Sequence, residues 1–70
     1  MNAMLTKFRV ELQTNPSPGM EFYRGYVDVF ADSDASGDDL FRAAVRQLQR
    51  TSFPDRGMSC WRMIGCEKCK

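Results

Sequence analysis

The first predictable element is a stretch from Lys7 to Leu12 in which polar and apolar side chains alternate strictly. A period of two residues is typical of a strand with one buried face, because successive side chains point to opposite faces of the sheet. The sequence therefore predicts a half-buried strand over residues 7–12. Its inward-facing side chains are Phe8, Val10 and Leu12.

A turn and a second strand are expected next. Residues 15–19 read Asn-Pro-Ser-Pro-Gly, which favours a turn because proline fixes φ and Gly19 permits a positive φ. Residues 21–31 are rich in aromatic and β-branched side chains and predict a strand, in which Gly25 indicates a bulge or bend. One face of this strand carries Val27, Val29 and Ala31, and the other carries Tyr26, Asp28 and Phe30.

An amphipathic helix is predicted from Asp38 to about Arg50. Ser36, with Asp39 three residues later, resembles a capping box in which aspartate replaces the usual glutamate. One face of the helix collects the apolar side chains Leu40, Phe41, Ala44, Val45 and Leu48. The opposite face carries the arginine stripe, which consists of Arg42, Arg46 and Arg50.

A third strand is expected from Met58 to Ile64, after Pro54 and Gly57 have interrupted the helical pattern. Trp61 is predicted to point inward, because it is the largest apolar side chain available there. Residues 65–70 are expected to form a flexible C-terminal tail.

The order strand–strand–helix–strand predicts a single small α+β domain over residues 1–70. A right-handed crossover through the helix returns the third strand parallel to the second, where it pairs with the first. The predicted fold is therefore ββαβ, a three-stranded antiparallel sheet of spatial order 2-1-3 with one helix packed on one face. The other sheet face stays open, and it is expected to carry Lys7, Arg9, Glu11, Tyr26, Asp28, Phe30 and Arg62.

The length of 70 residues and the absence of histidine both argue against an enzyme. So short a chain rarely builds the deep pocket of an enzyme, and histidine is the commonest general base and neutral metal ligand. We therefore expect no enzyme activity, no catalytic residue and no cofactor. No apolar run approaches the ~20 residues of a membrane span, and residues 1–12 lack a signal-peptide core, so we expect a cytoplasmic protein without a membrane partner.

The formal net charge of +1 conceals two oppositely charged segments. Residues 32–39 contain four aspartates and no basic residue, whereas residues 40–70 contain seven basic and two acidic residues. The acidic cluster could imitate a run of phosphates and occupy a nucleic-acid-binding groove of a partner. It could also serve only the helix, through the dipole and through pairing with Arg42. The members of this acidic cluster are Asp32, Asp34, Asp38 and Asp39, and Asp28 brings the number of aspartates within twelve residues to five.

The arginine stripe and the open sheet face each allow two interpretations. Arginines at this spacing bind phosphates or an acidic protein, but they also form ordinary solvated helix faces. Tyr26 and Phe30, beside basic residues, are typical of a stacking platform for single-stranded nucleic acid. They are equally typical of a protein interface, including one with a second copy of the chain, and Phe22 and Tyr23 would extend that patch.

Three cysteines, at positions 60, 66 and 69, raise the question of a metal or redox site. The C-x-x-C spacing is shared with zinc and dithiol sites, but structural zinc needs four ligands and no fourth cysteine or histidine is present. Residues 32–37 match the start of a calcium loop, yet Ala43 stands where the bidentate glutamate belongs. We predict no metal site at either place.

The strand at residues 26–31, the acidic residues that follow, the amphipathic helix and the Trp-bearing strand together resemble small α+β proteins encoded by phages and mobile elements, including anti-CRISPR proteins. The resemblance covers most of the chain but lies in architecture, size and charge, so no functional residue is carried over. It implies a non-enzymatic inhibitor that binds a subunit of a CRISPR–Cas surveillance complex and blocks nucleic-acid recognition in the bacterial host cell.

The sequence thus favours a protein-binding inhibitor or regulator. The alternative is a small nucleic-acid-binding module that uses the arginine stripe or the open sheet face. The candidate partner-binding residues are Asp32, Asp34, Asp38, Asp39, Arg42, Arg46, Arg50, Tyr26 and Phe30.

Overall fold

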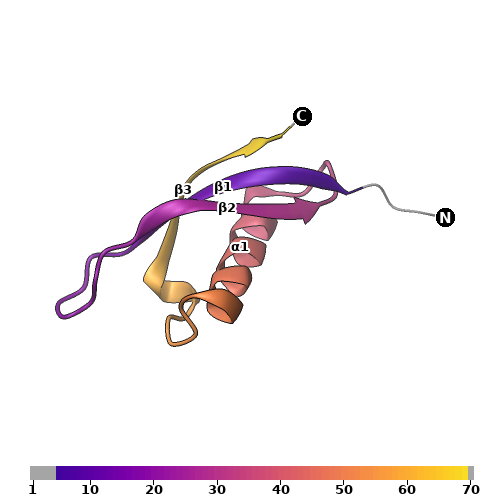
Figure 1. Ribbon diagram of the computed structural model, residues 1–70. Coiled ribbons are helices and arrows are strands. Elements are labelled where there is room, and N and C mark those ends of the chain that lie inside the picture. Colours follow the sequence, from indigo (N-terminus) through magenta and orange to yellow (C-terminus); the bar gives the residue numbers. More distant parts are fainter. Residues whose placement is uncertain (1–4, 70) are drawn as a thin grey trace.

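The computed structural model describes residues 5–69 and forms a three-stranded sheet with a helix along one face (Figure 1). The sheet order is β2-β1-β3, and β1 pairs antiparallel with both neighbours. This arrangement confirms the predicted α+β fold with a 2-1-3 sheet. The elements are β1 (Thr6–Thr14), β2 (Arg24–Ala31), α1 (Gly37–Thr51), the 3-10 helix η1 (Met58–Cys60) and β3 (Trp61–Lys68).

The core lies between the sheet and α1. The predicted inward side chains of β1 are all buried, and Val10 and Leu12 have no exposed surface. Burying one such side chain stabilises the fold by about 1.5–3 kcal/mol. The central strand therefore contributes much of the core of a chain that can bury little else. The core consists of Phe8, Val10, Leu12, Val27, Val29, Leu40, Ala44, Val45, Leu48 and Trp61.

The C-terminal segment differs from the prediction of a strand ending at Ile64 and a tail at residues 65–70. Met58–Cys60 forms η1, and β3 continues through Lys68. The pairing of β1 with β3 shifts by one residue between Glu11 and Leu12, so Ile64 is an extra residue in β3. This bulge and the exposed residues after it remove the apolar alternation, which is why residues 65–68 were wrongly assigned to a tail. Lys70 lies outside the described residues.

The prediction of a bulge at Gly25 is also wrong. The pairing of β1 with β2 runs without a shift, and Gly25 lies opposite Leu12 on the helix-facing side. A Cβ atom at this position would come within 2.6 Å of the Tyr23 hydroxyl oxygen. Glycine is therefore required because the Tyr23 side chain passes directly beneath the strand.

Tyr23 belongs to an aromatic cluster that closes the core near the end of α1. Its ring centroid lies 4.9 Å from that of Phe53 and 5.8 Å from that of Trp61, and both contacts are tilted or edge-on. Trp61 is 3% exposed, which confirms its predicted inward position. Tyr23 is thus not part of an exposed patch with Phe22, which is 61% exposed.

We predict that Leu12→Ala lowers the free energy of unfolding by about 2–5 kcal/mol, because the substitution leaves a cavity in the core. A domain of this size has about 3–5 kcal/mol of stability, so much of the variant should be unfolded at 25 °C. Urea denaturation followed by tryptophan fluorescence measures the loss. Leu5→Ala is the matched control, since Leu5 is 57% exposed and its truncation should change stability by less than about 0.5 kcal/mol. Equal losses in both variants would contradict the core assignment.

Candidate functional site

Among residues 5–69, no element covers the sheet face opposite α1 (Figure 1). Its side chains alternate along each strand with those of the core. The register aligns Tyr26, Glu11 and Gly65 in one row across the three strands, and Asp28, Arg9 and Glu67 in the next row, with the β1 residue in the middle of each. We call this surface the open face, and it consists of Lys7, Arg9, Glu11, Gln13, Arg24, Tyr26, Asp28, Phe30, Arg62, Gly65 and Glu67.

All seven residues predicted for the open face lie on it. Sequence reasoning missed Gln13, Arg24, Gly65 and Glu67. The same alternation predicts Gln13 when it is continued two residues beyond Glu11 in β1, and Arg24 when it is continued two residues before Tyr26 in β2. Gly65 and Glu67 could not be assigned to the open face by alternation, because the bulge at Ile64 shifts the alternation of inward and outward side chains in β3 by one residue.

Most charges of the open face neutralise one another. Asp28 forms ion pairs with Lys7 at 3.5 Å and with Arg9 at 3.6 Å, and Glu11 accepts a hydrogen bond from the Nε of Arg24 at 2.8 Å. Exposed ion pairs of this kind contribute only about 0–1 kcal/mol each to stability. Their main effect is electrostatic, because they leave little net charge in the middle of the face.

Two aromatic side chains stand out of this neutralised surface. Tyr26 and Phe30 are each 63% exposed. They lie four residues apart on β2, which separates them by roughly 13 Å along the strand. The guanidinium of Arg9 lies 5.7 Å from the centre of the Tyr26 ring, within the range of a cation–π interaction. The Tyr26 ring thus has one cationic neighbour and remains largely exposed for contact.

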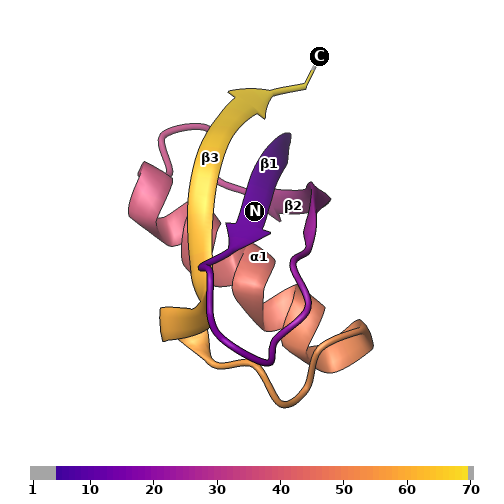
Figure 2. The same cartoon turned by 90° about the vertical axis from the view of Figure 1, so that its left-hand side faces the viewer.

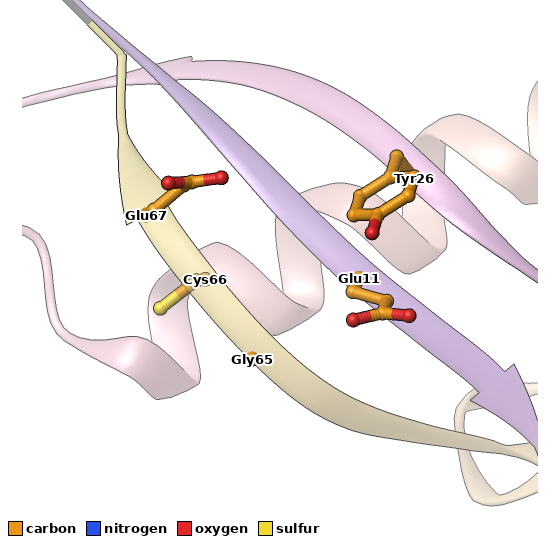
Figure 3. A pocket seen from close by; sticks show the side chains of 5 residues that line it. All are labelled: Glu11, Tyr26, Gly65, Cys66 and Glu67. Carbon is orange, nitrogen blue, oxygen red and sulfur yellow. The ribbon is translucent and has the colours of Figure 1, made fainter.

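A shallow hollow lies beside Tyr26 (Figure 3). Its floor is Gly65, where no atom lies within 4 Å of the position that a Cβ would take. Glu11 and Glu67 rise on its two sides, whereas Cys66 belongs to the opposite sheet face, beside Val10. The hollow is a recess in an interaction surface rather than an enclosed cavity.

The acidic cluster divides into two pairs with different roles. Ser36 Oγ accepts from the Asp39 backbone N–H at 3.1 Å, and Asp39 Oδ2 accepts from the Ser36 N–H at 3.4 Å, which completes the predicted capping box. Asp38 pairs with Arg42 at 3.2 Å, one turn along α1. Asp38 and Asp39 therefore act on the helix itself, while Asp32 and Asp34 are exposed in the connection before it.

The arginine stripe lies on the side of α1 that faces away from the sheet. Arg42, Arg46 and Arg50 are exposed, and the buried positions of α1 are on the opposite side. Within the described chain, Arg46 and Arg50 have no carboxylate at ion-pair distance. The structure thus does not unite the candidate residues, because the stripe and the aromatic pair occupy opposite surfaces of the molecule.

The three cysteines lie in different parts of the C-terminal segment, with Cys60 in the 3-10 helix η1 and with Cys66 and Cys69 in extended chain. Cys66 lies in β3, and the Cys69 N–H donates to the Lys7 carbonyl at 2.8 Å, which continues the strand pairing. Three residues of extended chain span roughly 10 Å, whereas a disulfide needs Cα atoms within about 7 Å. Cys66 and Cys69 therefore do not form a closed C-x-x-C site in this conformation. Among residues 5–69, no three Cys, Asp or Glu side chains gather closely enough to hold a metal ion.

Comparisons with protein-family models, curated proteins and solved structures give no match to this chain. Over residues 5–69, no helix has the length and apolar character needed to cross a bilayer. The structure itself is thus the basis for any functional proposal.

We predict that Asp39→Ala lowers the free energy of unfolding by about 1 kcal/mol, because it removes one half of the capping box and a favourable charge at the helix N-terminus. Asp34→Ala removes an equally charged side chain from the exposed connection and should change stability by less than about 0.5 kcal/mol. Thermal unfolding followed by circular dichroism compares the two. A larger loss for Asp34→Ala would refute the division of the acidic cluster.

Proposed function

We propose that the protein is a non-enzymatic inhibitor or regulator that binds a protein partner through the open face. The observation that carries the proposal is the pair Tyr26 and Phe30, each 63% exposed on a sheet surface that nothing in the described chain covers. Aromatic residues and arginine dominate the energetic centres of protein interfaces, because they bury a large area at low entropic cost. The arrangement of Arg9 against Tyr26 fits such a centre.

The charges of the open face favour a protein over a nucleic acid. A platform for single-stranded nucleic acid combines exposed aromatic rings with a positively charged groove that follows the phosphates. Here Lys7, Arg9 and Arg24 are each paired with a carboxylate. The aromatic rings consequently sit in a nearly neutral surface, which supports contact with a protein of mixed polarity.

The proposed partner class follows from the resemblance to small phage-encoded inhibitors. It is a subunit of a CRISPR–Cas surveillance complex, encountered in the cytoplasm of the bacterial host. In this proposal Tyr26 and Phe30 supply the buried contact area. Asp32 and Asp34, which are not used by the helix cap, supply negative charge that steers the protein toward a nucleic-acid-binding surface of that subunit.

We predict that Tyr26→Ala and Phe30→Ala each weaken binding to a purified surveillance complex by about 30-fold, as expected for truncating an interface hot spot of about 2 kcal/mol. Biolayer interferometry against complexes of several CRISPR types measures the dissociation constants. Phe22→Ala is the matched control, because Phe22 is 61% exposed but precedes β2, and its affinity should stay within about threefold of the wild type.

Two outcomes of this experiment count against the proposal. One is that no complex binds, which removes the proposed partner class. The other is that single-stranded DNA or RNA binds at low salt, and that binding is lost in Arg46→Ala and Arg50→Ala but kept in Tyr26→Ala. The second outcome would establish the alternative nucleic-acid-binding module on the arginine stripe.

A further inference from the structure

Within residues 5–69, the outer edge of β3 has no neighbouring strand. In the order β2-β1-β3, one side of β3 pairs with β1 and the other faces solvent. Figure 2 shows β3 at the margin of the sheet, on the side of β1 away from β2, with the start of α1 extending past it in this view. A row of unpaired backbone N–H and C=O groups along an edge is a template for another strand.

The hydrogen bonds to β1 fix which backbone groups point outward. The Asn15 N–H donates to the Cys60 carbonyl, and the Cys69 N–H donates to the Lys7 carbonyl. Residues of an antiparallel strand alternate between bonding to one neighbour and facing the other side. This alternation can be followed along β3 from each end as far as the bulge at Ile64. The residues whose backbone N–H and C=O groups face outward are Trp61, Met63, Cys66 and Lys68.

On the open face, two charged side chains next to this edge have no ion-pair partner. Arg62 lies opposite Gln13 and Glu67 lies opposite Arg9, so both project from the open face. Within residues 5–69 neither takes part in an ion pair, although the basic and acidic side chains of β1 and β2 on the same face are all paired. The unpaired charges are thus one positive and one negative, and they stand near the two ends of the free edge.

We propose that two copies of the chain join through this edge, with β3 antiparallel to β3 of the partner subunit over its whole length. The two-fold axis then passes between Ile64 and Gly65. Arg62 faces Glu67 of the partner subunit, and Glu67 faces Arg62 of the partner subunit, so that two ion pairs form. This pairing neutralises the two charges of the open face that have no ion-pair partner within residues 5–69 of one copy.

The backbone geometry agrees with the same register. Trp61 meets Lys68 of the partner subunit, and Met63 meets Cys66 of the partner subunit. All four have outward-facing N–H and C=O groups, so each of these pairs can exchange two hydrogen bonds. Arg62 and Glu67 of the partner subunit then form a non-hydrogen-bonded pair, the type in which the two opposite side chains lie closest together.

Side-chain direction selects this register over its neighbours. Met63 and Cys66 both lie on the helix-facing side, opposite Leu12 and Val10, while Arg62 and Glu67 both lie on the open face. Moving the register by one residue would oppose side chains from different faces. A register with Cys66 opposite Cys66 of the partner subunit keeps the faces matched but places Glu67 opposite Gly65 of the partner subunit, which leaves both charges unpaired.

The edge charges also explain selectivity. Charged side chains and bulges on edge strands normally prevent pairing with unrelated strands. Arg62 and Glu67 would still disfavour pairing with most other strands. A second copy of β3 would be favoured, because it places an opposite charge against each of them. The resulting six-stranded sheet would carry two copies of the open face side by side. This inference is independent of the proposed partner, because it uses the edge of β3 and not Tyr26 or Phe30.

Analytical ultracentrifugation of charge-reversed variants tests the inference. Arg62→Glu and Glu67→Arg each place like charges opposite each other at both pairs, and each should raise the dimer dissociation constant by about tenfold or more. An equimolar mixture of the two variants restores both ion pairs, one of them with reversed sign, and should form a heterodimer with nearly wild-type affinity. Arg46→Glu and Glu21→Arg make the same charge changes away from the edge and should leave the dimer unchanged.

A second measurement reports the register. In Met63→Cys, mild oxidation should give a disulfide to Cys66 of the partner subunit, whereas the wild type should give none between the two copies of Cys66. Circular dichroism confirms that each variant is folded. The inference would be overturned by a wild type that stays monomeric up to about 1 mM, by a mixture of the two reversed variants that does not associate, or by a wild-type disulfide between the two Cys66 residues.

Discussion

The structure depends on one constraint, which is that a single helix must cover a sheet that has two faces. The central strand β1 places Phe8, Val10 and Leu12 under α1, and the apolar side of the helix meets them there. The described part of this short chain contains no second α-helix to cover the reverse face. The polar residues of β1 and their neighbours on β2 and β3 consequently become the molecular surface, and their identity decides what that surface can bind.

Charge is distributed over this surface in an ordered way. In the middle, carboxylates and basic side chains of β1 and β2 neutralise each other and frame Tyr26. At the edge, Arg62 and Glu67 are left without partners inside the described chain. The neutral, aromatic region supports contact with another protein, and the unpaired edge supports contact with a second copy. Both proposals thus derive from the same uncovered sheet, through different parts of it.

The sequence alone predicted an element and its buried side wherever a local pattern of residues determines both. The alternation of β1 predicted both its strand and its buried face, and Ser36 with Asp39 predicted the helix start. It was insufficient where the contact joined distant segments. Tyr23 is buried because Phe53 and Trp61 meet it from elsewhere in the chain, and Gly25 makes room for that same ring. The length of β3 was missed because the bulge at Ile64 interrupts its alternation.

Similarly, helical spacing placed Arg42, Arg46 and Arg50 on one stripe but could not show that the stripe and Tyr26 lie on opposite surfaces.

The central claim is that one sheet face is covered and the other is open in solution. Solvent paramagnetic relaxation enhancement, measured by NMR with a soluble gadolinium chelate, tests it directly. The account predicts strong enhancement for the ring protons of Tyr26 and Phe30, and protection of the methyl groups of Val10 and Val45. Protection of the Tyr26 and Phe30 rings to the same degree as the Val10 methyl groups would contradict it, because the second face would then also be covered.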